Sequence, residues 1–483
     1  RLTGSLWGGL LAEDVAVAGV GGFGAAQRNT ILSVERLRLR YGLGTLLRTR
    51  DPLASIRSVT IEQPRAIVTL RTDHTLDLLE LFRFRRFEPR EAPTFVGRVR
   101  LIGGEVVFLD ELHPVDGATR RTDLRALNAD LRFRRRGDAT VTAAARAPGV
   151  FEALSVDGRV LLDGGWSFDG TTELTEADLA RLAPYLNPVL EPSLSLRSGL
   201  ASAAGQLRLS RPRDEQLPFD SGFDLNVDCF DCSLGTAALT APLNGVTGRI
   251  GVRMASTATG EPDPGDMITL RGLQATVAGA TLRVDGRIPN PKSPQLDLRL
   301  RAESLSPRQV AAILADPGIL AGFAGEGNMR ADLRLRGQAG SWSTEGWFEP
   351  RGVGWGSLVE LQGGRVLFAA RQSGPGLDGW AGSATLTNVD AVSDRLSEPL
   401  RAWYGRAVLD AGRLRLEKVA GRIGAAQVAL DGTLDDLAPR RQPTADLTAT
   451  VRNLSPLALR ALLPARFQPR SAQGNLSGQE RII

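Results

Sequence analysis

One sequence module occurs twice in this 483-residue chain and constrains its fold more than any other feature. Residues 279–315 and 424–464 each contain an alternating segment with Asp-Gly, a proline-containing loop, a second alternating segment, and Leu-Ser-Pro before an apolar run. These markers repeat after roughly 145–150 residues, and weaker ones after roughly 115–126, which exceeds the period of ordinary solenoids. The sequence therefore predicts a body that grows by the addition of similar units.

Short segments throughout the chain alternate aliphatic residues with arginine, aspartate or glutamate. In residues 33–41, for example, leucines and a tyrosine share one face and arginines the other. This period of two is typical of a strand with one buried face. We interpret Gly103-Gly104 and the three Asp-Gly pairs, which begin at 157, 285 and 431, as turns. Many such strands with frequent turn signals predict a mostly β protein with a large antiparallel sheet.

A few short helices are expected to interrupt the strands. The residues point to a helical turn at 43–50, a helix at 76–82 and a helical run at 177–186. The Leu-Ser-Pro elements at 305 and 454 also predict helices, because serine is a favourable N-cap and proline a favourable first-turn residue.

A sheet of this size must cover its aliphatic face or use it. We predict an elongated, twisted antiparallel sheet that curls into an open hydrophobic groove. The candidate groove-lining residues come from the alternating segments: Leu37, Leu39, Leu207, Leu209, Leu298, Leu300, Leu333, Leu335, Leu414, Leu416, Val428 and Leu430. The predicted organisation is an N-terminal segment (1–95), three groove repeats (96–190, 191–320 and 321–465) and the start of a further repeat (466–483).

Composition argues against an enzyme. The chain has only two histidines, His74 and His113, and it lacks a nucleophile elbow, a phosphate-binding loop and a dinucleotide fingerprint. We expect no catalytic residues, metal or cofactor. The basic clusters at 83–87 and 132–136 also fit strands with one solvated face, and nearby acids dilute their charge, so nucleic acid is not an expected partner.

Cys229 and Cys232 form the one CxxC motif. Positions i and i+3 of a regular strand lie about 10 Å apart, so the pair can bridge only if residues 229–232 form a turn or bulge. A structural disulfide, unbridged thiols and, with less support, a metal or catalytic role all remain open.

Four N-terminal segments read LTGSLWGGLLAEDVAVAG (from Leu2), LSVERLRLRYGLGTLL (from Leu32), LASIRSVTIEQPRAIVTL (from Leu53) and LDLLEL (from Leu76). Together they resemble the start of AsmA/TamB-like proteins. The repeated strand, Asp-Gly, loop, strand and Leu-Ser-Pro unit is similar to the repeating β-groove of the same superfamily.

This resemblance implies a periplasmic protein of a double-membraned bacterium, held in the inner membrane by an anchor before Arg1. Its groove would carry phospholipid between the inner and outer membranes, and a further C-terminal domain would contact an outer-membrane barrel protein. The alternative is an assembly scaffold that pairs its strands with folding outer-membrane proteins. A surface-exposed, adhesin-like β-solenoid is a third and weaker interpretation.

Overall fold

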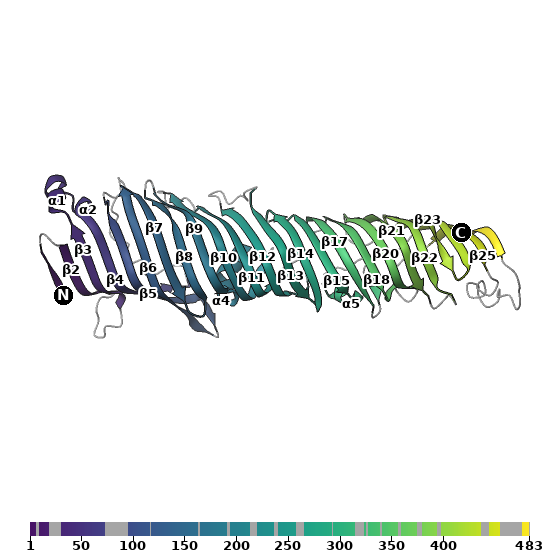
Figure 1. Ribbon diagram of the computed structural model, residues 1–483, viewed down its shortest axis with the longest axis horizontal. Coiled ribbons are helices and arrows are strands. Elements are labelled where there is room, and N and C mark those ends of the chain that lie inside the picture. The colour runs from purple at the N-terminus through teal and green to yellow at the C-terminus, as the bar shows by residue number, and fades with distance from the viewer. Residues whose placement is uncertain are drawn as a thin grey trace. The chain divides into compact units, whose positions relative to one another are not determined.

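The computed structural model is mostly β (Figure 1). It describes residues 1–5, 9–18, 30–72, 95–115, 117–162, 165–190, 194–212, 220–235, 240–256, 265–291, 293–313, 323–324, 327–338, 341–355, 359–373, 379–393, 398–435, 444–454 and 476–482. The prediction of a mostly β protein with an open, mainly antiparallel sheet and a few short helices is confirmed.

The chain divides into two compact units. The first contains Arg1–Val189, Leu196–Phe230 and Ile250–Met267, and the second contains Leu190–Ser195, Asp231–Arg249 and Ile268–Ile483. These limits differ from those of the predicted repeats, which remain a description of the sequence.

In the first unit, successive strands lie side by side in chain order (Figure 1). They are β1 (Leu2–Ser5), β2 (Gly9–Ala18), β3 (Thr30–Tyr41), β4 (Ile56–Leu70), β5 (Arg98–Val115), β6 (Ala118–Arg135), β7 (Asp138–Ala147), β8 (Phe151–Leu161), β9 (Gly165–Asp178) and β10 (Ser195–Pro212). Their pairings are antiparallel except that β4 and β5 are parallel. Parallel neighbours need a crossover connection rather than a tight hairpin turn.

The second unit has a similar arrangement of strands. Two strands, β11 (Asp220–Gly235) and β12 (Leu243–Ser256), contribute residues to both units. The other strands of the second unit are β13 (Met267–Val277), β14 (Ala280–Pro289), β15 (Leu296–Leu305), β16 (Phe323–Ala324), β17 (Asn328–Gln338), β18 (Ser341–Arg351), β19 (Val353–Trp355), β20 (Val359–Gln372), β21 (Trp380–Val392), β22 (Leu400–Asp410), β23 (Arg413–Ile423), β24 (Ala426–Asp435), β25 (Thr444–Leu454) and β26 (Leu476–Ile482). The pairings from β14 to β26 are antiparallel. The short strands β16 and β19 pair with each other, and β19 also pairs with β20.

The helices are short: α1 (Leu43–Thr49), α2 (Pro52–Ser55), α4 (Leu179–Leu190) and α5 (Pro307–Ile313). The predicted helices at 43–50, at 177–186 and after Leu305 are confirmed, whereas those at 76–82 and after Leu454 lie outside the described residues. At α5, Ser306 Oγ accepts from Gln309 N–H at 3.2 Å, and Gln309 Oε1 accepts from Ser306 N–H at 2.8 Å. This reciprocal cap explains why Leu-Ser-Pro begins a helix.

The interpretation of the glycine pairs as turns is wrong. Gly103-Gly104 lies inside β5, and the Asp-Gly pairs at 157, 285 and 431 lie inside β8, β14 and β24. The glycines of the Asp-Gly pairs are needed because neighbouring strands approach closely: a Cβ on Gly286 or Gly432 would lie within 2.2 Å of a carbonyl oxygen of the next strand. A strand interior can require glycine for this reason as readily as a turn can.

Two of these aspartates, Asp285 and Asp431, each accept a hydrogen bond from a backbone N–H of the preceding strand. Gly272 and Lys418 have left-handed backbones, with φ of 57° and 50°. The N–H of Gly272 donates to Asp285 Oδ1 at 2.7 Å, and the N–H of Lys418 donates to Asp431 Oδ2 at 3.1 Å. The pairing shifts register at Lys418, as expected for a bulge.

The same device recurs with other side chains. The N–H groups of Gly103, Glu176 and Ala402, all with positive φ, donate to Asn128, Ser202 and Asp390 at 3.0, 3.1 and 2.8 Å. Bulges bend strands and increase their twist, so bulges that recur in several strands curve the sheet.

Removing one of these acceptors tests the device. We expect Asp285→Ala to lower the free energy of unfolding by about 1 kcal/mol, because the N–H of Gly272 loses its partner. Hydrogen exchange at the Gly272 amide should become faster. Asp285→Asn is the matched control, because its amide oxygen can still accept the bond. Unchanged exchange in the alanine variant would contradict the assigned role.

Candidate functional site

The apolar face of the first unit is built from residues that face one another across successive strands. We call two sets of register partners the central row and the flanking row. The central row contains Ala12, Leu37, Ile61, Leu101, Ala129, Ala143, Val156, Thr172 and Gly205. The flanking row contains Leu10, Leu39, Val59, Val99, Leu131, Val141, Gly158, Gly170 and Leu207.

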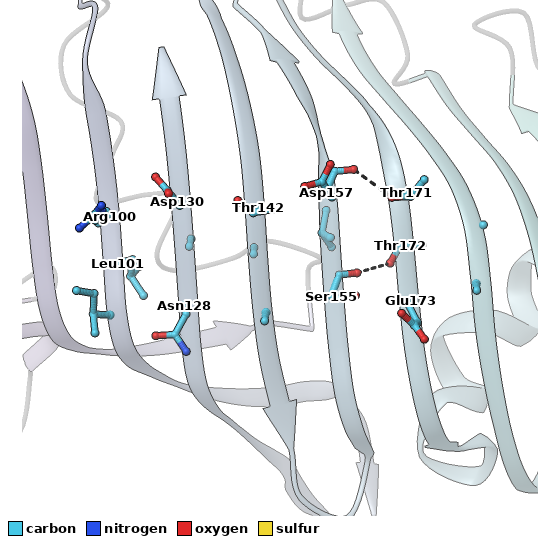
Figure 2. Close-up of a pocket in the computed structure, with 17 residues that line it drawn as sticks. Arg100, Leu101, Asn128, Asp130, Thr142, Ser155, Asp157, Thr171, Thr172 and Glu173 are labelled. Carbon is cyan, nitrogen blue, oxygen red and sulfur yellow. Dashed lines mark hydrogen bonds between the residues drawn. The ribbon is translucent and has the colours of Figure 1, made fainter. Parts of the chain in front are cut away.

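A hollow of about 730 Å³ crosses β5 to β10 along the central row (Figure 2). Its strands are held together partly by side chains: Thr172 Oγ1 donates to the carbonyl of Ser155 at 3.3 Å, and Thr171 Oγ1 to that of Asp157 at 3.4 Å. The side chains of the central row project little in this region, because Ala129 and Ala143 carry only a methyl group and Gly205 carries no side chain. Polar residues next to the central row, among them Arg100, Asp130 and Glu173, also contribute to the lining of the hollow.

The second unit repeats the pattern with two further rows. The first contains Gly286, Leu298, Leu335, Thr344, Ala370, Gly382, Leu409, Leu414 and Leu434. The second contains Val284, Leu300, Leu333, Gly346, Phe368, Ala384, Ala407, Leu416, Gly432 and Leu447. Both run from β14 to β24 or beyond.

The structure places the predicted lining residues on these faces. Leu37, Leu39 and Leu207 belong to the rows of the first unit, and Leu209 lies two residues beyond Leu207 on the same strand face. Leu298, Leu335 and Leu414 share one row of the second unit. Leu300, Leu333 and Leu416 share the other row. Val428 and Leu430 lie on the same face of β24 as Gly432, at every second position of the strand.

Partial exposure distinguishes these residues from a sealed core. Val428 is buried, with 8% of its surface exposed, and the other eleven predicted residues are half-buried. A closed core exists beside them in the second unit, where Val277, Ala280, Val353 and neighbouring residues are almost inaccessible to solvent. The apolar rows can thus be reached from solution, whereas this core cannot.

Sequence reasoning missed the small residues of the rows. Ala143, Gly205 and Gly382 do not stand out as apolar residues in the sequence. Whether each of them lines an apolar row depends on which residues of the neighbouring strands it pairs with. The recurrence of alanine and glycine within alternating segments was a usable signal, because each small side chain deepens the face at its position.

The opposite face of the sheet is covered with ion pairs. In the second unit, Arg299 pairs with Asp332 at 2.7 Å, and Arg334 pairs with Asp297 at 2.9 Å. Hydrogen bonds from these arginines hold the pKa values of Asp332 and Asp297 below their usual range. In the first unit, Arg98 and Arg132 lower the pKa of Asp130 to about 2. Such exposed pairs add little stability, but they keep this face polar.

A buried polar cluster anchors α4 to the hairpin of β5 and β6. Asp110 is completely buried and accepts hydrogen bonds from the N–H groups of Leu112 at 2.9 Å and His113 at 3.0 Å, and from the Tyr185 hydroxyl. Burial opposes ionisation of Asp110, but the bonds from Tyr185 and His113 outweigh it and lower its pKa. Burial and the bond to Asp110 raise the pKa of Tyr185 to about 12.

This cluster brings distant parts of the first unit together. Tyr185 follows β9, whereas Asp110 lies in β5, and β6, β7 and β8 separate those strands within the sheet. Arg120 also donates to the carbonyl of Arg181 at 3.0 Å. The sheet between β5 and β9 is therefore spanned at one end by α4.

Cys229 and Cys232 both lie in β11, where they are buried and not joined by a disulfide. The structure therefore does not contain the disulfide that was one of the alternatives for this pair. Asp231, which lies between them, has a left-handed backbone with φ of 54°. Both cysteines are buried whereas Phe230 and Asp231 are exposed, as expected for a bulge that turns the two cysteines to the same face of the sheet. The strand thus contains the bulge that a bridge would require, yet the two thiols are not bonded to each other in this structure.

The described residues contain no group of three or more histidine, cysteine, aspartate or glutamate side chains placed to hold a metal ion. Among the helices of the same part of the chain, none is long and apolar enough to cross a membrane. No protein-family model matches the chain, and no curated protein does either.

Proposed function

We propose that the chain is a periplasmic, bridge-like lipid-transfer protein that carries phospholipid acyl chains along its apolar face between inner and outer membranes. The observation that carries this proposal is the continuity of half-buried aliphatic rows across strand after strand of each unit. The ion-paired opposite face supports it, because only one side of the sheet is suited to apolar cargo.

The apolar rows would lower the main barrier to lipid transfer. Exposing two acyl chains of about 15 methylenes each to water costs on the order of 24 kcal/mol, at about 0.8 kcal/mol per methylene. An accessible aliphatic face removes much of this cost while the headgroup stays in water. No covalent chemistry is needed, so the proposed function requires no catalytic residue.

The location and partners are part of the same proposal. Attachment to the inner membrane, contact with an outer-membrane barrel protein and membership of the AsmA/TamB-like superfamily rest on the resemblance of the N-terminal and repeat sequences.

An assembly scaffold is the second candidate, because the sheet is open. The edge of an open sheet presents unpaired backbone groups to which another strand can add. This function would use the backbone at the edge of the sheet, whereas lipid transfer would use the side chains of its apolar face.

Lipid content separates the two candidates. We expect the purified chain to retain phospholipid, detected by mass spectrometry after organic extraction, in an amount that exceeds that of a similarly purified soluble control protein. Photocrosslinkers at Leu298 and Leu333 should label this lipid, whereas one at Arg299, on the opposite face, should not. Equal labelling at all three positions would contradict the proposal, and specific crosslinks from an edge strand to a barrel protein would favour the scaffold.

A further inference from the structure

The connection between β3 and β4 forms a fixed corner made of α1 and α2 (Figure 1). The N–H of Gly42 donates to the carbonyl of Ser55 at 2.8 Å and closes the corner. Asp51 Oδ1 caps α2 by accepting from the N–H groups of Leu53 and Ala54 at 2.9 and 3.2 Å. These bonds give the side chains of the corner defined positions.

The corner presents two leucines to solvent. Leu47 of α1 is 78% exposed and Leu53 of α2 is 54% exposed, whereas Leu43 and Leu46 are half-buried. A single exposed leucine needs no explanation. Two on adjacent short helices, in a corner held by hydrogen bonds, form an apolar projection that the described part of the fold leaves uncovered.

Exposed arginines lie close to these leucines along the chain. Arg40, Arg48, Arg50 and Arg57 lie at the ends of β3 and β4 or within the corner, and all four are exposed. Within the part of the chain that the structure describes, none of them forms an ion pair, unlike Arg299 and Arg334 of the second unit. The carboxylate of Asp51 is engaged in capping α2. The corner therefore combines two exposed leucines with four exposed arginines that have no ion-pair partner among the described residues.

We propose that this corner, with Leu47, Leu53, Arg48 and Arg50 at its centre, docks onto the surface of an anionic phospholipid bilayer. Short apolar projections bind membranes by inserting into the boundary between headgroups and acyl chains. Arginines beside them pair with phosphate and are attracted by the negative surface potential of anionic lipids. The charge of the corner thus complements an anionic bilayer, and the two leucines supply insertion. This inference goes beyond the proposed lipid transfer, because docking does not use the apolar rows.

Sedimentation with vesicles tests this docking. The wild-type chain should bind vesicles of phosphatidylcholine with 30% phosphatidylglycerol at least tenfold more strongly than vesicles of phosphatidylcholine alone. Leu47→Ser combined with Leu53→Ser should weaken binding to the anionic vesicles about tenfold or more. Arg48→Gln combined with Arg50→Asn should abolish the preference for anionic lipid and its sensitivity to salt. Asparagine is chosen at Arg50 because this residue has a left-handed backbone, with φ of 52°, which asparagine tolerates.

Two controls keep the outcomes distinct. Leu367→Ser removes a leucine that is 46% exposed on the ion-paired face, and it should leave vesicle binding unchanged. Leu335→Asp alters the apolar rows, and it should leave docking unchanged even if lipid transfer fails. The proposal is overturned if the paired leucine or paired arginine variants bind anionic vesicles as the wild-type chain does. It is also overturned if the corner crosslinks to a protein while vesicle binding is absent.

Discussion

Leu335→Asp should reduce lipid transfer between donor and acceptor vesicles by roughly 100-fold. Leu335 lies in β17 between Leu298 and Thr344 of the adjacent strands, in the middle of an apolar row of the second unit. An aspartate there places a carboxylate where acyl chains would pass. An unpaired polar or charged group in such a setting costs about 3 kcal/mol, which corresponds to a factor of roughly 100.

The fold should tolerate this change, because Leu335 is half-buried and water can reach the new carboxylate. Circular dichroism and thermal denaturation should confirm an intact sheet. The matched control is Arg334→Gln, which lies next to Leu335 but on the ion-paired face. Glutamine is used because an aspartate at 334 would face Asp297 and Glu345. Transfer at the wild-type rate by the folded Leu335→Asp variant would exclude the apolar rows as the lipid route.

Gly432→Ala should destabilise the second unit by about 3 kcal/mol or more. Gly432 lies in β24 with φ of 139°. An added Cβ would lie 2.1 Å from the carbonyl oxygen of Asp446 and 2.8 Å from the Cα of Leu447. Both atoms belong to the backbone of β25, so relief requires the strands to separate.

Thermal denaturation should show a lower midpoint for this variant, and hydrogen exchange should become faster first in β24 and β25. Gly363→Ala is the control. Gly363 lies in β20, its φ is not in the left-handed region, and a Cβ there would meet nothing within 4 Å. A similar small effect from both substitutions would show that the close approach at Gly432 is relieved without cost.

The alternation of residues along each strand was sufficient to predict which side of the sheet is apolar. Leu333 and Leu335 alternate with Arg334 and Arg336, and the structure places the two pairs on opposite faces. Successive side chains of a strand point to opposite faces regardless of which strands lie beside it, so this alternation can be read from the local sequence.

Local sequence could not show how strands align with one another. That Leu37 falls in the same row as Leu101 depends on the parallel pairing of β4 with β5, which no local pattern indicates. The cluster of Asp110, His113 and Tyr185 escaped prediction for the same reason, because its members come from separate elements. Asp-Gly was misread because glycine serves both tight turns and close strand packing, and only the neighbouring strand decides between them.

The succession of pairings between strands close in the chain has a consequence for how this protein folds. From β5 to β10, and again from β20 to β26, each strand pairs with the one that follows it. Short loops cost little closure entropy, and chains with local contacts fold faster than those that must join distant segments. Each new strand can therefore pair with the edge strand that has already formed. Such a sheet can fold while the chain is being synthesised, with only the most recently made strand left unpaired on one side.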